Sequence, residues 1–153
     1  MSTEQPISEL LDQMPPVDVE AEMAVIGSLM LDPSKRERVG KIVQAEHFYH
    51  NGCRRFFVGL MTLDSLDWIL LRDAMRKSGQ LDVAGGSAFL DECIQSVAVA
   101  AHAEYYAGIV AEKARKRAMI HFAIEFLKAL YSGKFEASEL AERMIQRLQE
   151  TMQ

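Results

Sequence analysis

The amino-acid sequence predicts an all-α protein, with a compact multi-helix head followed by a hairpin of two long helices. Apolar residues recur at helical spacing in nearly every segment, and no segment shows the sustained alternation that is typical of a strand. The four prolines are confined to Pro6, Pro15, Pro16 and Pro33, so the rest of the chain can form helices without interruption. With 153 residues, the chain is long enough to bury a core of its own.

The composition excludes several classes of protein. The formal net charge of -5 argues against a protein whose main task is to bind phosphates through clustered lysine and arginine. Cys53 and Cys93 are too few for a disulfide framework in a chain of this length, so we expect reduced thiols and a cytoplasmic location. The first residues lack the regions of a signal peptide, and no apolar run is long enough to span a membrane.

The chain divides into three predicted parts. Residues 1–14 are mostly polar and are expected to form a flexible N-terminal arm. Residues 15–110 form the helical head, and residues 111–153 form the C-terminal helical hairpin.

Residues 15–32 are predicted to form the helix around which the head is organised. Asp18 can cap its start, because the carboxylate can accept from free backbone N–H groups of the first turn. Beyond that turn the helix is apolar on most sides, which predicts that it is buried on most sides. Gly27 is unfavourable inside a helix, so we expect it to allow a neighbouring helix to approach closely.

The second helix is expected to begin with Asp32 as its cap and Pro33 at its first position. Its apolar positions are Val39, Ile42 and Val43, and the charged residues 35–38 are expected to face water. The connection over residues 45–52 holds Phe48 and Tyr49, which we expect to lie under the core.

Three shorter helices complete the predicted head. The first contains Phe56, Phe57 and Leu60. The second begins after Asp67 as its cap and ends at Gly79 in the left-handed conformation. After a turn at residues 82–86, Ser87 opens the third.

One long helix is predicted from about residue 101 to residue 132. Tyr105, Tyr106, Ile109 and Val110 are expected to pack its first third on the head. Its last third is apolar on a wide arc made of two neighbouring stripes, and a final helix from about residue 138 offers only one stripe in return. The apolar surface left over should pair with another chain. The candidate interface residues are Met119, Phe122, Ile124, Phe126, Leu127, Leu130, Leu140, Met144 and Leu148. Which stripe faces inward stays open.

Sequence patterns for catalysis and metal binding are weak. Gly40-Lys41 and Gly133-Lys134 lack the other residues of a phosphate-binding loop, so the chain should not hydrolyse ATP. His47, His50 and Cys53 have a spacing that could suggest zinc, but no fourth ligand is near.

The middle of the long helix carries a basic segment in an otherwise acidic chain. This segment comprises Lys113, Arg115, Lys116 and Arg117. A solvated helix face is the ordinary reading of such a run, and contact with a nucleic acid or an acidic partner is the alternative. Single-stranded DNA would bind only weakly and at low salt.

Several of these segments resemble the opening of the N-terminal domain of the DnaB family of replicative DNA helicases. The resemblance follows one order over about residues 15–117. The segments that carry it are Pro15-Pro16, Glu20-Ala21-Glu22, Ala24-Val25-Ile26-Gly27-Ser28-Leu29-Met30-Leu31-Asp32, Phe48-Tyr49, Arg54-Arg55-Phe56-Phe57, Gly85-Gly86-Ser87-Ala88-Phe89-Leu90 and Glu104-Tyr105-Tyr106-Ala107-Gly108-Ile109-Val110.

The resemblance implies a non-catalytic domain that serves ring assembly. In that family a helical head is followed by a hairpin, the hairpins pair, and the domains form the collar of a hexameric ring on which primase docks. It implies a dimer for this chain alone and a hexamer in a full-length helicase, with ATP and magnesium expected only in a following helicase domain. The sequence departs from the family pattern at His47, at Arg115 and Lys116, and in a shorter connection over residues 63–67.

Two other hypotheses stay open at this stage. One is a free-standing helical adaptor or regulator that binds a replicative helicase. The other is an enzyme, for which the sequence offers no constellation of residues.

Overall fold

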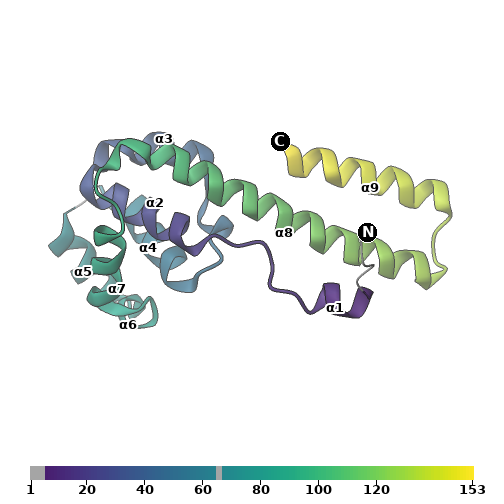
Figure 1. The fold of residues 1–153 in the computed structure, drawn as a ribbon, viewed down its shortest axis with the longest axis horizontal. Coiled ribbons are helices and arrows are strands. Elements are labelled where there is room, and N and C mark those ends of the chain that lie inside the picture. Colours follow the sequence, from purple (N-terminus) through teal and green to yellow (C-terminus); the bar gives the residue numbers. More distant parts are fainter. Residues whose placement is uncertain (1–5, 65–66) are drawn as a thin grey trace, which may run out of the picture.

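The computed structural model describes residues 6–64 and 67–153, and within them it contains nine α-helices, three short 3-10 helices and no strand (Figure 1). The predicted fold class is confirmed, because a multi-helix head is followed by a hairpin of two long helices. The first five residues of the predicted arm, and Ser65 and Leu66 in the short connection, lie outside the described residues.

Helix α2 (Val19–Leu31) occupies the centre of the head, as predicted. Asp18 caps it, since its Oδ1 accepts from the backbone N–H of Ala21 at 2.9 Å. Helices α7 (Gly86–Gln95) and α8 (Ala103–Ser132) both pack against it. A Cβ atom at Gly27 would lie 2.1 Å from the carbonyl oxygen of Cys93 on α7, so the close approach expected at this glycine is present.

The start of the next helix differs from the prediction. Asp32 caps it through Ser34, but Pro33–Lys35 forms a 3-10 turn, η1, before α3 (Arg36–Ile42) begins. Arg36 was expected to face water, and this prediction is wrong. Its Nη1 donates to the carbonyl oxygens of Leu60, at 3.1 Å, and Leu63. The guanidinium thereby satisfies free carbonyl groups at the end of α4 (Asn51–Thr62).

The connection between α3 and α4 is organised by the buried carboxylate of Glu22 on α2. It accepts from the backbone N–H groups of Tyr49 at 3.2 Å and His50 at 2.9 Å, which orients the turn that follows η2 (Ala45–His47). Phe48 is buried as predicted, whereas the expectation that Tyr49 is buried is wrong. Tyr49 stays exposed because the Glu22 contact is made by its backbone.

The second half of the head follows the predicted start and stop signals closely. Asp67 caps α5 (Trp68–Lys77), and Gly79 follows it with a φ of 74°. Residues 82 and 83 were expected to begin a turn, but they end a one-turn helix, α6 (Gln80–Val83), and the turn is limited to residues 84 and 85. Helix α7 begins at Gly86, one residue before the expected Ser87.

Helix α8 leaves the head and continues into the hairpin, where α9 (Ala137–Met152) runs antiparallel to it (Figure 1). A short 3-10 turn, η3 (Ala100–His102), precedes α8, and Gly133 ends it with a φ of 69°. The buried residues of α8 are Ala103, Ala107, Val110 and Ala111. Tyr105 was expected to pack on the head but is 69% exposed, since the small alanines form the contact instead.

Candidate self-association surface

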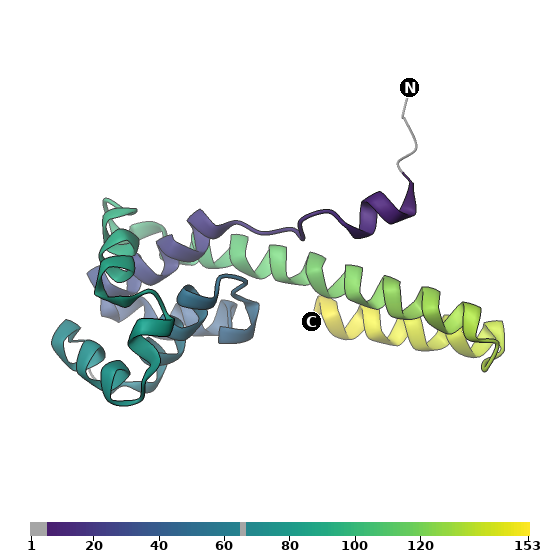
Figure 2. The same ribbon diagram turned by 90° about the horizontal axis from the view of Figure 1, so that it is seen from below.

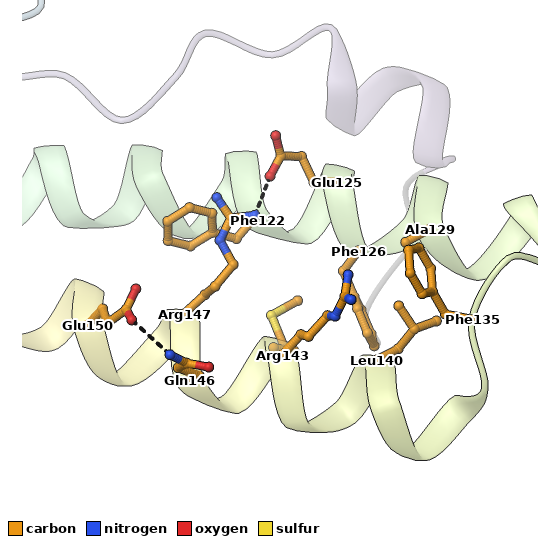
Figure 3. Close-up of a pocket in the computed structure, with 11 residues that line it drawn as sticks. Phe122, Glu125, Phe126, Ala129, Phe135, Leu140, Arg143, Gln146, Arg147 and Glu150 are labelled. Atoms are coloured by element: carbon orange, nitrogen blue, oxygen red, sulfur yellow. Dashed lines mark hydrogen bonds and ion pairs between the residues drawn. The ribbon is translucent and has the colours of Figure 1, made fainter.

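The inner faces of the hairpin helices meet along a loosely filled seam. Phe122, Phe126 and Ala129 of α8 face Leu140 and Met144 of α9 across a cleft of about 340 Å³ (Figure 3). Leu140 is the one buried residue of α9. Phe122 and Phe126 therefore face inward, whereas Met119 and Leu130, which share their stripe at helical spacing, stay exposed. The inward face is thus only part of one predicted stripe.

Arginines of α9 close this seam. The Nη1 of Arg147 lies 2.6 Å from the Oε2 of Glu125, and its guanidinium carbon lies 4.3 Å from the centre of the Phe122 ring (Figure 3). Arg143 covers Phe135 in the same way, at 4.4 Å. The hydrogen bond from Arg147 lowers the pKa of the Glu125 carboxyl below its ordinary value. The side chains of Arg147 and Glu125 are both in contact with water, so their ion pair adds little to stability.

A second set of large apolar side chains on the hairpin is left in water. We call it the outer face, and it comprises Met119, Ile120, Leu127, Leu130, Ile145 and Met152. Leu127 follows the seam residue Phe126, and Ile145 follows the seam residue Met144. On each helix, the outer-face side chain is therefore displaced around the helix axis in the same sense from the seam. In an antiparallel pair, stripes rotated in the same sense lie on the same side. The outer face is therefore one apolar surface made by both helices.

The predicted interface residues thus separate into groups. Phe122, Phe126, Leu140 and Met144 line the intramolecular seam, and Leu148 is half-buried. Met119, Leu127 and Leu130 belong to the outer face. Ile124 lines a different cleft, beside residues 10–16.

The basic segment of α8 does not act as a unit. Arg117 turns toward the head, where its Nη1 donates to the carbonyl oxygen of Pro16 at 2.8 Å and its Nη2 to that of His47 at 2.6 Å. Burial lowers the pKa of this guanidinium, whose carbon lies 5.6 Å from the ring centre of Tyr49. Lys113 and Lys116 remain available for a partner, and Arg115 lies 3.5 Å from Glu112.

Arg117 links the arm, the head and the hairpin, a role that its sequence context did not predict. Its two partners are backbone carbonyl groups, which exist at every position, and they lie 101 and 70 residues away along the chain. No side-chain pattern could have indicated them.

The residues considered for zinc have other roles. His47 Nδ1 accepts from the backbone N–H of Gln44 at 2.9 Å, and His50 Nδ1 accepts from that of Cys53 at 3.3 Å. The neighbouring Cys93 thiol and burial raise the pKa of the Cys53 thiol, so it stays protonated. In the part of the chain that the structure describes, no three histidine, cysteine or acidic side chains are grouped to hold a metal ion.

Residues 6–64 and 67–153 also include no helix that is long and apolar enough to cross a membrane.

These features define a class of protein, an all-helical head-and-hairpin domain with an exposed apolar face on its hairpin. Residues 14–112 match the family described as "DnaB-like helicase N terminal domain". The chain belongs to this family, as its resemblance predicted.

Individual relatives agree with this assignment. The chain is 30% identical over 152 residues to the replicative DNA helicase DnaB of Geobacillus stearothermophilus, covering 96% of this chain and 34% of that protein. It is 34% identical over 122 residues to that of Treponema pallidum (strain Nichols), covering 77% of this chain and 28% of the relative. The chain therefore spans about a third of the length of these relatives.

The fold has also been seen in a solved structure. The crystal structure of the N-terminal domain of DnaB helicase from Mycobacterium tuberculosis superposes with a TM-score of 0.80 at 26% sequence identity. The match covers 90% of this chain and 99% of that one, so it includes both the head and most of the hairpin.

Proposed function

We propose that this chain is the assembly domain of a replicative DNA helicase, in which paired hairpins build the collar of the ring and the collar recruits primase. The observation that carries the proposal is the outer face of the hairpin, in a chain that belongs to the DnaB N-terminal family. The proposed state is a dimer for this chain alone and a hexamer in a full-length helicase.

The size of the outer face supports pairing. Burying one large apolar side chain contributes about 1.5–3 kcal/mol, and the association of two proteins costs about 4–15 kcal/mol. In a twofold pairing the same residues of both copies become buried, so the contribution of each side chain counts twice. Leu127 and Leu130 of α8 and Ile145 of α9 are 37%, 48% and 57% exposed in the single chain, so only about half of each contribution remains to be gained on pairing. Counted in both copies, they offset the lower end of the cost of association.

Catalysis is assigned to another part of the helicase. We propose that ATP and magnesium bind only in a following helicase domain. The chain itself contacts single-stranded DNA weakly at most, through Lys113, Arg115 and Lys116, because Arg117 is occupied by backbone carbonyl groups. As a part of a bacterial replicative helicase it would act in the cytoplasm.

The pairing is tested by placing charges on the outer face. Leu127→Glu combined with Leu130→Glu should convert a dimer into a folded monomer, measured by sedimentation equilibrium and circular dichroism. The matched control is Lys128→Glu, which adds a carboxylate in the same turn on the opposite side of α8. If the unmutated chain is monomeric at high micromolar concentration, the proposal of hairpin pairing is wrong.

Recruitment is tested separately by titrating a bacterial primase into the unmutated chain and into the monomeric variant in a calorimeter. A saturable heat of primase binding to the unmutated dimer, but not to the monomeric variant, would support recruitment through the assembled collar. Absence of binding to both would contradict the primase part of the proposal while leaving the pairing intact.

A further inference from the structure

The described part of the predicted arm, together with the two prolines that follow it, lies along the side of α8 that faces away from α9 in both views (Figures 1 and 2). From here on, the arm means Pro6–Pro16. It includes the one-turn helix α1 (Ile7–Leu11). Leu10, Leu11, Met14 and both following prolines line a cleft of about 370 Å³ with Ile120 and Ile124 of α8. Ile120 is also part of the outer face, so the arm borders that face on α8.

The arm is held in this position by Arg117. Its guanidinium bonds the carbonyl oxygen of Pro16 at the end of the arm and that of His47 in the head. Pro15 and Pro16 restrict the backbone at the same point, because each ring fixes φ. The arm therefore leaves its anchor in a defined direction, along α8.

Docking on α8 leaves the apolar side chains of the arm incompletely covered. Leu10 is 49% exposed, Leu11 53% and Met14 78%. Among the described residues that line the cleft between arm and α8, Arg117 is the one that carries a charge, and it donates to two backbone carbonyl oxygens. Most of the side chains that line this cleft are apolar, so an apolar surface would cover the arm better than a nucleic acid or an acidic peptide.

We infer that the arm is the third layer of the self-association surface, and that a second copy of this chain covers Leu10, Leu11 and Met14 together with the outer face. This inference rests on the proposed pairing of hairpins and adds to it a segment that is distant from the hairpin in sequence. Because a twofold contact repeats every interaction, both arms would contribute to the dimer.

The experiment measures the dimer dissociation constant of the whole chain by sedimentation equilibrium. Leu11→Ser combined with Met14→Ser removes the exposed apolar groups of the arm. Arg117→Met keeps the alkyl stem and removes the donors that anchor the arm. Lys116→Gln is the control, since it removes the same charge from the neighbouring position on α8 without adding apolar surface beside Met119 and Ile120.

We expect both arm variants to raise the dissociation constant more than tenfold without loss of helical content, and Lys116→Gln to change it less than twofold. Unchanged or tighter pairing of the Leu11→Ser/Met14→Ser variant would overturn the inference. The arm would then either make no contact with the second copy or compete with it for the outer face. An unmutated chain that stays monomeric would instead overturn the proposed function. If Arg117→Met loses helical content, the arm double variant decides the result, because its side chains are exposed and outside the core.

Discussion

In the head, side chains such as those of Phe56, Leu60 and Leu90 are completely removed from water, whereas on α9 only Leu140 is buried. The head reaches this state by packing several helices around α2, each covering a different side. The hairpin has two helices, and its seam contains a cleft and water-accessible ion pairs. The head therefore buries its own apolar side chains, while the hairpin leaves large apolar side chains exposed.

The largest expected effect compares a phenylalanine in each region. Phe56→Ala should lower the free energy of unfolding by about 3–5 kcal/mol, because it leaves a cavity in the fully buried core. Phe122→Ala in the half-buried seam should lower it by about 1 kcal/mol. Urea unfolding followed by circular dichroism measures both. Equal losses would show that the seam is as well packed as the head.

A second comparison uses glycines of the two long central helices. Gly27→Ala should destabilise the chain by about 1–3 kcal/mol, since the new methyl group would meet the backbone of α7. Gly108→Ala on α8 meets no atom within 4 Å and should stabilise the helix by up to about 1 kcal/mol. Thermal melting of the two variants at one protein concentration gives the sign of each effect. A stabilised Gly27→Ala variant would contradict the close packing of α2 on α7.

A third expectation concerns pH at the junction between head and hairpin. Burial lowers the pKa of His47 below 6.5, and the positive charges of Arg115 and Arg117 act in the same direction against Glu46. Between the lowered pKa of His47 in the folded chain and its ordinary pKa in the unfolded chain, the unfolded chain binds more protons than the folded one. Stability should therefore fall as the pH drops below about 6.5 and level off below the folded pKa.

The contribution of His47 can be isolated with two variants. Urea unfolding between pH 5 and 7.5 should show a smaller slope for His47→Gln than for the unmutated chain. His102→Gln, at an exposed position before α8, is the matched control and should keep the slope. If the free energy of unfolding of His47→Gln depends on pH as steeply as that of the unmutated chain, other titrating groups cause the dependence.

The smallest expected effect lies on the surface of the hairpin. Arg147→Met removes the ion pair with Glu125 but keeps most of the packing over Phe122. Because both groups are in contact with water, the urea midpoint should shift less than in any of the destabilising variants above, and the shift should disappear in high salt. A shift as large as that of Gly27→Ala would make this pair a main support of the seam.

Much of the fold could be predicted because its signals are local. The caps at Asp18 and Asp67 and the left-handed glycine at residue 79 each act within one helical turn. The apolar stripes of the hairpin follow from helical periodicity alone, and so does the conclusion that one stripe of α9 cannot cover two of α8. The sequence therefore indicated that the hairpin has apolar surface to spare, but the predicted interface residues did not include Ile120, Ile145 and Met152 of the outer face.

Other features required the three-dimensional arrangement. Glu22, Arg36 and Arg117 all bind backbone groups of distant segments, and a backbone group has no sequence signature. The burial of alanines in place of Tyr105 depends on how α8 is rotated against α2.

The sequence by itself determined that this protein is all-helical, that its head is built around residues 15–32, and that its hairpin carries more apolar surface than it can bury. Periodicity and capping decide these points, because they act between residues a few positions apart. Only the tertiary structure decided that Phe122 and Phe126 face inward while Leu127 and Leu130 face outward, and that the arm lies beside Ile120. The physical reason is that the rotation of one helix against another is set by the packing of the whole chain.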